Sequence, residues 1–142
     1  MEDKVEPIPR TMEKFFGCSG KMVKPSHSTV KNVVKNVVKN VVKKVRKGKV
    51  ITLDQLREKL AKDFGVQAAC PASTTKALQI LSREEKPICY WRVIKKKGEL
   101  ISKYPNGQKG HAALLETEGF EIDFSKKEPY VVDFEARLSK LI

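Results

Sequence analysis

The stretch ITLDQLREKLAKDFGVQAACPASTTKALQIL, residues 51–81, decides the fold that the sequence predicts. Thr52 and Gln55 have the spacing of a capping box, in which each side chain bonds the backbone N–H of the other. This pattern predicts a helix that begins after Thr52 and continues to about Phe64, where Gly65 ends it.

The second half of the stretch predicts another short helix. Pro71 suits the first turn of a helix, and the helix is expected over Ala72–Leu81. Apolar residues recur every three or four positions, as they do on the buried face of a helix. The expected core residues are Leu53, Leu56, Leu60, Phe64, Ala77, Leu78 and Leu81. A helix, a tight turn and a second helix together indicate a helix-turn-helix.

The segment before this stretch is basic and repetitive. VKNVVKNVVKNVVKKV runs from Val30 to Val45, and residues 29–49 carry eight basic side chains and no acidic one. A four-residue period places the paired valines on one side of a helix, so we expect an amphipathic helix that Ser28 or Thr29 caps. Because valine favours extended structure, a strand is the competing interpretation. The lysines would bind phosphates or only solvate an exposed face.

A second basic segment follows the two helices. Residues 87–110 have a net charge of +5 and predict a hairpin with strands at Cys89–Lys95 and Glu99–Lys103. Lysines would then gather at its tip, as in the wing of a winged helix. With a short strand at Lys49–Thr52, these features predict an α+β, mainly helical fold: a winged helix-turn-helix with a small β-hairpin wing.

The rest of the chain is expected to be less basic and less regular. A helix through Leu114 and Leu115 should end at Gly119, and one or two short strands should precede a terminal helix from Asp133. We expect three parts: a flexible N-terminal arm (1–28), a DNA-binding domain (29–124) and a C-terminal extension (125–142).

Composition limits the functions that the chain can have. It has 142 residues and a net charge of +12, which favours a polyanionic partner such as nucleic acid over an anionic membrane surface. No apolar run approaches the roughly 20 residues that span a bilayer. Cys18, Cys70 and Cys89 lie far apart, so we expect no disulfide framework, metal site or cofactor. The expected location is cytoplasmic (nucleoid-associated) or nuclear.

Five short motifs occur in a fixed order along the chain. They are KGKVITLDQL at Lys47–Leu56, TKAL at Thr75–Leu78, ICYWRVI at Ile88–Ile94, YPNGQKGHAALL at Tyr104–Leu115 and ETEG at Glu116–Gly119. They are similar to GKVTTYGQL, the end of RAVGxAL, IPCHRVV or IPWHRVI, YSGGxxxKxxLL and EG. The chain from about Val30 to Ile122 therefore resembles the DNA-binding domain of the O6-alkylguanine-DNA alkyltransferases. The resemblance is greatest to the cysteine-lacking alkyltransferase-like proteins.

The resemblance implies a way of binding DNA. The family places its second helix in the minor groove, rotates the damaged guanine out of the stack and fills the gap with an arginine. The partner would be double-stranded DNA, with most of the affinity from phosphate contacts. The expected DNA-binding residues lie on the second helix and at the wing tip: Ser73, Thr74, Thr75, Lys76, Lys95, Lys96 and Lys97.

The resemblance also implies that the transfer reaction is absent. The position of the alkyl-accepting cysteine falls on Tyr90, and that of the proton-relay histidine on Trp91. A phenol with a pKa of about 10 is a poor alkyl acceptor, so no catalytic residue is expected. The family's inserted arginine aligns with Ala72 and its nucleotide-rotating tyrosine with Leu53. Cys89 is an alternative acceptor, but on a strand it would face away from Tyr90.

A base pocket is expected near the aligned acceptor position. Its residues would be Tyr90, Trp91, Arg92, Tyr104, Asn106 and Gly107. An aromatic wall at Tyr90 or Trp91 would stack on a base, which contributes about 1–3 kcal/mol per base, whereas plain core packing is the alternative. Arg92 matches a family arginine whose usual role is structural.

The leading hypothesis is a non-catalytic duplex DNA-binding protein. It would either recognise alkylated guanine or act as a general or regulatory DNA binder. Two other classes stay open: a DNA alkyltransferase that uses Cys89, and a scaffold that binds an unidentified protein partner.

Overall fold

The computed structural model describes residues 4–8, 10, 20–24 and 38–140 of the chain. Residues 38–42 are helical, which agrees with the helix expected from the valine repeat. The part of that predicted helix at residues 30–37 lies outside the described residues. Buried valines of residues 38–45 pack into the core, which explains the paired valines of the repeat.

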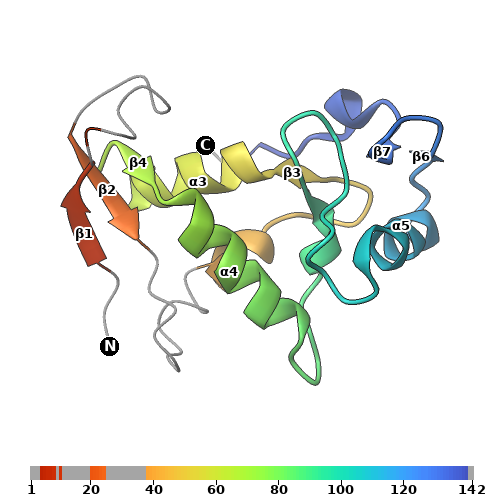
Figure 1. The fold of residues 1–142 in the computed structure, drawn as a ribbon, viewed down its shortest axis with the longest axis horizontal. Helices are drawn as coiled ribbons and strands as arrows, with labels where there is room; N and C mark the ends of the chain where they lie inside the picture. The colour runs from red at the N-terminus through yellow and green to blue at the C-terminus, as the bar shows by residue number, and fades with distance from the viewer. Residues whose placement is uncertain (1–3, 9, 11–19, 25–37, 141–142) are drawn as a thin grey trace.

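A small sheet closes one end of the domain. It has the order β1-β2-β4, with β1 (Lys4–Pro7) antiparallel to β2 (Lys21–Lys24) and β2 parallel to β4 (Ala68–Ala69). Figure 1 shows this sheet at the left, beside the two long helices of the centre. Strands within the expected N-terminal arm therefore belong to the fold, and the three-part division of the chain stays a prediction.

Two helices with the predicted boundaries occupy the centre of the fold. They are α3 (Leu53–Asp63) and α4 (Pro71–Ser82). The capping box is confirmed: the Gln55 N–H donates to Thr52 Oγ1 at 3.2 Å, and the Thr52 N–H donates to Gln55 Oε1 at 2.9 Å. Local sequence signals are thus sufficient to define both helices.

The apolar faces of the central helices meet in one core. Leu56 and Leu60 of α3 and Leu78 and Leu81 of α4 are fully buried, as predicted. Burial of one leucine side chain stabilises the fold by about 2 kcal/mol, because its apolar surface leaves water. The same core includes Tyr90, so the segment after α4 is anchored to both helices.

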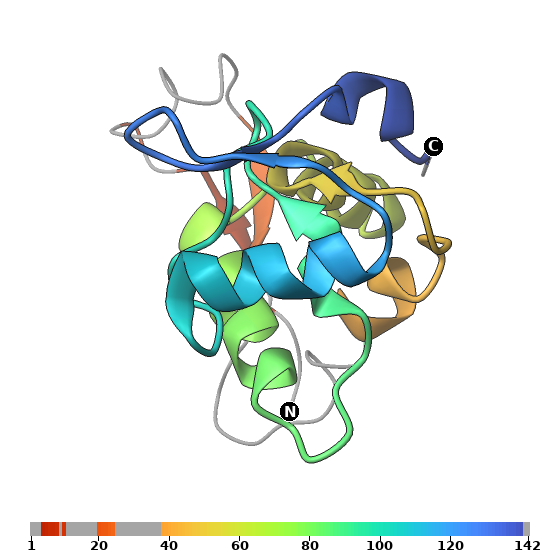
Figure 2. The ribbon, with the colours of Figure 1, turned by 90° about the vertical axis from the view of Figure 1, so that its right-hand side faces the viewer.

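The predicted first wing strand is wrong over most of its length. Instead of a strand at Cys89–Lys95, the chain makes a 3₁₀ helix, η1 (Tyr90–Arg92), and only then a two-residue strand, β5 (Val93–Ile94). β5 runs parallel to β3 (Ile51–Thr52), and Figure 2 shows the two side by side behind the helix nearest the viewer. The short strand expected before the first helix is confirmed as β3.

The predicted return strand also has a different partner. A tight turn does follow β5, because the Lys95 N–H donates to the Glu99 carbonyl oxygen at 2.9 Å. Beyond the turn, however, Glu99 bridges to Tyr130, and the Leu100 N–H donates to the Pro129 carbonyl oxygen at 3.0 Å. The expected β-hairpin is therefore replaced by pairing with the C-terminal part of the chain.

The other end of the domain holds the last helix and two small elements. α5 (Gly107–Thr117) precedes a two-stranded antiparallel ribbon of β6 (Ile122–Asp123) and β7 (Tyr130–Val131). A final 3₁₀ helix, η2 (Phe134–Arg137), takes the place of the expected terminal helix. The observed fold is thus a mixture of helices and small sheets.

Gly110 permits a close contact at the start of α5. A Cβ atom on this residue would lie 2.4 Å from the Pro105 carbonyl oxygen and 2.7 Å from Asn106 Cβ. Such separations require the preceding turn to move. The turn is itself constrained, because Asn106 has a left-handed backbone with φ of 66°.

We expect the G110A variant to be destabilised by about 1–3 kcal/mol, the usual cost of overpacking, although alanine favours a helix over glycine. Urea unfolding would measure the change. The A113G variant, at an exposed position of the same helix, serves as a control for helix propensity alone. An unfolding free energy that rises in G110A would contradict the steric argument.

Candidate nucleic-acid interface

One side of α4 is accessible to a partner. Ala72, Lys76 and Arg83 are exposed, and Thr75 and Gln79 between them are half-buried. Their spacing of three and four residues places them along one stripe of the helix. We call this stripe the α4 face, and it contains two of the four predicted helix contacts.

The other two predicted contacts point inward. Ser73 is 5% exposed and Thr74 is fully buried, and Thr74 Oγ1 donates to the Cys70 carbonyl oxygen at 2.8 Å. A hydroxyl that bonds the preceding turn of its own helix is satisfied locally. Neither side chain reaches the surface in this structure. The DNA contacts expected of Ser73 and Thr74 stay predictions.

Lys103 is a further cation, beside the C-terminal end of the α4 face. Arg83 Nη1 makes long hydrogen bonds to the carbonyl oxygens of Lys103, at 3.4 Å, and Gln79, at 3.5 Å. Lys103 itself is exposed, and the contact of its carbonyl oxygen with Arg83 places it beside the C-terminal end of α4. Lys76, Arg83 and Lys103 therefore form a basic surface. Sequence reasoning missed Lys103 because it belongs to another segment.

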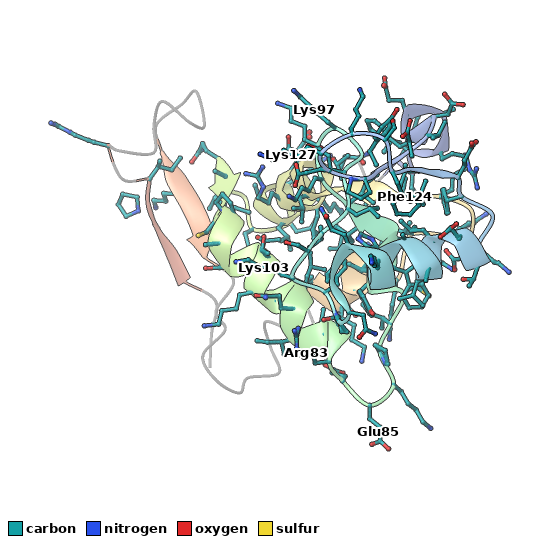
Figure 3. All side chains as sticks on the ribbon, turned by 45° about the vertical axis from the view of Figure 1, so that its right-hand side comes forward. Arg83, Glu85, Lys97, Lys103, Phe124 and Lys127 are labelled. Carbon is teal, nitrogen blue, oxygen red and sulfur yellow. The ribbon has the colours of Figure 1, made fainter. Side chains whose placement is uncertain are left out.

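The predicted wing lysines lie elsewhere. Lys96 and Lys97 are exposed and Lys95 is half-buried, in a turn of residues 95–98 that we call the lysine turn. Figure 3 shows Lys97 at the top of the molecule, whereas Arg83 lies toward the bottom. The structure does not bring the lysine turn and the C-terminal half of α4 together on one surface.

An aromatic cluster lies beneath the end of α4. The ring centroids of Tyr90 and Tyr104 are 4.7 Å apart, and those of Tyr90 and Trp91 are 5.3 Å apart. The Tyr104 hydroxyl donates to the Tyr90 carbonyl oxygen at 3.1 Å. Both tyrosines are at most 5% exposed. Two of the residues expected in a base pocket are therefore core residues in this structure.

The environment of Tyr90 keeps its hydroxyl protonated. Burial raises the pKa of Tyr90, and the nearby positive charge of Arg83 offsets only part of this rise. Burial also raises the pKa of Tyr104 well above its ordinary value. A neutral phenol is a weak nucleophile. At the position that aligns with the family's cysteine, this protein thus holds a buried, neutral phenol.

His111 completes the cluster and was not predicted. It is fully buried, and its ring centroid lies 4.8 Å from that of Tyr104. Its Nδ1 accepts from the Ile101 N–H at 3.0 Å, which requires the proton on Nε2, 2.7 Å from the Trp91 carbonyl oxygen. Burial lowers the pKa of His111 to about 4. The neutral imidazole therefore joins η1 to the segment before α5.

Arg92 is held by a buried ion pair. Its Nε and Nη2 donate to the two Glu118 carboxylate oxygens at 2.9 and 2.6 Å, and Nη1 donates to the Val45 carbonyl oxygen at 2.8 Å. The two side chains are only 12% and 8% exposed. The Arg92 hydrogen bond lowers the pKa of Glu118. Each of the three guanidinium nitrogens of Arg92 thus donates a hydrogen bond within the fold, so Arg92 links η1 to Glu118 and to the Val45 carbonyl oxygen.

The remaining candidates are at the edge of this cluster. Trp91 is half-buried, and its indole Nε1 lies close enough to Glu118 to help lower that carboxyl pKa, without a hydrogen bond of normal geometry. Asn106 is exposed at the start of α5, followed by Gly107 with φ of 65°. Trp91 thus packs edge-on against Tyr90, and the Gly107 N–H donates to the Tyr104 carbonyl oxygen at 2.9 Å.

Cys89 does not lie on a strand. It precedes η1, with φ of −73° and ψ of 58°, and is half-buried. The prediction that strand geometry turns it away from Tyr90 is therefore wrong, because a strand's alternation does not apply here. Among the described residues, no group of three or more His, Cys, Asp or Glu side chains could hold a metal ion.

Within the described part of the chain, every helix is too short or too polar to cross a membrane. No family model matches the sequence, and no curated protein is similar enough to count as a relative.

Solved structures nevertheless define the class of fold, which is that of an alkyltransferase-like protein. S. pombe Atl1, in a crystal structure with damaged DNA that contains O6-carboxymethylguanine, is 22% identical and superposes with a TM-score of 0.56. The match covers 75% of this chain and 94% of Atl1. A second structure, of S. pombe ATL with DNA, is 23% identical with a TM-score of 0.52, over 74% and 95% of the two chains. The present chain therefore shares the Atl1 fold.

Proposed function

We propose that this protein binds duplex DNA through the α4 face without catalysing a reaction, as an alkyltransferase-like DNA-binding protein. The observation that carries the proposal is the group of three exposed cations on or beside the exposed side of α4, Lys76, Arg83 and Lys103. The shared fold supports it, because Atl1 is found in complex with damaged DNA.

Phosphate contacts would supply most of the affinity. Each cation that neutralises a phosphate releases counterions, so the logarithm of the binding constant falls linearly with the logarithm of salt concentration. We expect the K76Q/R83Q/K103Q variant to bind a duplex at least about tenfold more weakly at 0.1 M salt, with a slope reduced by about three.

Fluorescence anisotropy with a labelled duplex would measure both quantities. The K49Q/K62Q/K140Q variant removes the same charge at exposed positions away from the α4 face and should retain most of the affinity. An equal loss in both variants would mean that binding is diffuse, and no binding by the native protein at low salt would end the proposal.

Recognition of alkylated guanine is the more specific form of the proposal. Its support is that Atl1, which shares this fold, is found with damaged DNA that contains O6-carboxymethylguanine. A duplex with O6-carboxymethylguanine should therefore compete better than its unmodified counterpart. Equal competition would leave a general or regulatory DNA binder.

The alternative of alkyl transfer to Cys89 has a direct test. The protein would be incubated with duplex containing O6-methylguanine, and its intact mass would be measured. We expect no mass gain, because transfer needs an activated thiolate and the position of the family's proton-relay histidine holds Trp91, which cannot act as a base. A gain of one methyl group that is absent in the C89S variant would overturn the non-catalytic proposal.

A further inference from the structure

The lysine turn is covered by the C-terminal part of the chain. We refer to residues 128–139 as the C-terminal segment. The Val131 N–H donates to the Gly98 carbonyl oxygen at 2.9 Å, and the Leu100 N–H donates to the Pro129 carbonyl oxygen at 3.0 Å. These hydrogen bonds join the C-terminal segment to both the tip and the return side of the turn.

The contact at the tip is also close-packed. A Cβ atom on Gly98 would lie 2.5 Å from Cδ1 of the Phe134 ring, so the ring lies directly against the glycine backbone. Gly98 is buried although it belongs to a polar turn. Lys96 and Lys97 stay exposed, but the C-terminal segment on Gly98 limits how far the turn can enter a DNA groove.

The C-terminal segment also neutralises the turn. Lys95 Nζ lies 3.1 Å from Glu128 Oε1. Lys97 lines a cleft of about 410 Å³ whose other charged residues are Glu99, Lys126, Lys127, Glu128, Asp133 and Glu135. Glu135 also lines an adjoining cleft of about 480 Å³ together with Lys96 and Lys97. A phosphate that approached these lysines would meet carboxylates at short range, which opposes polyanion binding.

The other end of the C-terminal segment is anchored to the domain. The Val50 N–H donates to the Arg137 carbonyl oxygen at 2.9 Å, and Arg137 Nε donates to the Gly48 carbonyl oxygen at 2.9 Å. Gln55 Nε2 donates to the Ser139 carbonyl oxygen at 2.9 Å. The segment is thus held at the lysine turn and at the start of α3.

We infer that the C-terminal segment withholds the lysine turn from DNA by packing on Gly98, pairing Lys95 and placing carboxylates in the clefts that Lys96 and Lys97 line, so that only the α4 face binds the duplex. This inference rests on the proposed DNA-binding function and deepens it. Removing acidic side chains of the C-terminal segment would leave the surface of the lysine turn strongly basic and so create a second phosphate-binding surface.

The first experiment compares salt slopes of duplex binding. We expect the E128A/E135A variant to bind several-fold more tightly than the native protein, with a slope steeper by about two. The E116A/E121A variant makes the same change in net charge at exposed positions outside the C-terminal segment. An equal gain in the two variants would overturn the inference, because it would reflect net charge alone.

Substitution of the lysines locates the gain. The K96Q/K97Q variant should bind DNA as the native protein does, whereas adding K96Q/K97Q to E128A/E135A should abolish the increase. Weaker binding by K96Q/K97Q alone would show that the lysine turn already contacts DNA. An increase that persists in the quadruple variant would place the new contact elsewhere, and either outcome overturns the inference.

A measurement without DNA separates this inference from the proposed function. Acetylation of lysines by an amine-reactive reagent, followed by peptide mass spectrometry, reports the reactivity of Lys95. We expect faster modification of Lys95 in E128A than in the native protein, with unchanged rates at Lys49 and Lys62 as internal controls. Equal modification rates of Lys95 in the two proteins would overturn the inference that the turn is covered, even if the native protein binds DNA. Failure of the native protein to bind DNA would overturn only the proposed function.

Discussion

Replacing Glu118 by alanine is expected to lower the free energy of unfolding by about 3–5 kcal/mol, the usual cost of removing one partner of a buried ion pair. The substitution leaves the Arg92 guanidinium buried with two of its hydrogen bonds lost. Urea unfolding at pH 7 would give the value. The effect should be large because Arg92 also donates to the Val45 carbonyl oxygen. Loss of the ion pair would therefore loosen η1, α5 and residues 38–45 together.

A double substitution tests whether the unpaired charge is the cause. The R92M/E118L variant removes both charges and retains apolar volume, and such replacements are often much less harmful than the loss of one partner. We expect it to be more stable than either R92M or E118A, although the Val45 carbonyl oxygen loses a partner at a cost of about 1–3 kcal/mol. A loss below 1 kcal/mol in E118A would contradict a structural role for the pair.

The central helices could be predicted because their signals are local. Thr52 and Gln55 cap α3 through atoms three residues apart, and Pro71 fits the first turn of α4 without any long-range contact. The burial of Thr74 could also have been predicted. It is three and four residues before Ala77 and Leu78, which were assigned to the core, so a helix places all three on one side.

The wing could not be predicted in the same way, because its pairing is decided by distant segments. Alternation after Cys89 suggests a strand, but it does not identify the strand's partner. In the structure, β5 pairs with β3, and the residues after the lysine turn pair with the C-terminal segment. The Arg92 side chain bonds Glu118, 26 positions later, which fixes η1 where a strand was expected.

The candidate site could likewise be predicted only in part. The motif order predicts which segments meet, and Tyr90, Tyr104 and Arg92 do lie close together in the fold. The sequence does not reveal that the tyrosines are buried. His111 was missed because a lone histidine in a helix carries no pattern of its own. Its signal was its position four residues before the buried Leu115, on the apolar side of α5.

His111 should make the protein sensitive to mild acid. Its pKa is lowered from 6.5 to about 4 in the folded protein, so the unfolded chain binds more protons between these two pH values. The stabilisation from neutral His111 is therefore fully present above pH 6.5 and is lost as the pH falls toward 4. A shift of this size corresponds to about 3 kcal/mol of unfolding free energy.

Burial is the main physical reason for the lowered pKa, because it disfavours the charged ring. Protonation would place a hydrogen on Nδ1, opposite the Ile101 N–H, and would bury a charge among aromatic rings. Urea unfolding at pH 7, 6, 5 and 4 would follow the loss. The H111Q variant, which keeps a donor and an acceptor but does not titrate, should lack most of the decline above pH 4.5.

Two comparisons separate His111 from the other groups that titrate in acid. His27 is the other histidine of the chain, and the H27Q variant should retain the decline. The Glu118 pKa is lowered, so stability linked to that carboxylate is lost below its ordinary value of 4.5, at a lower pH than most of the His111 effect. If H111Q and the native protein lose stability in parallel between pH 6.5 and 4.5, His111 is not the acid-sensitive group of this fold.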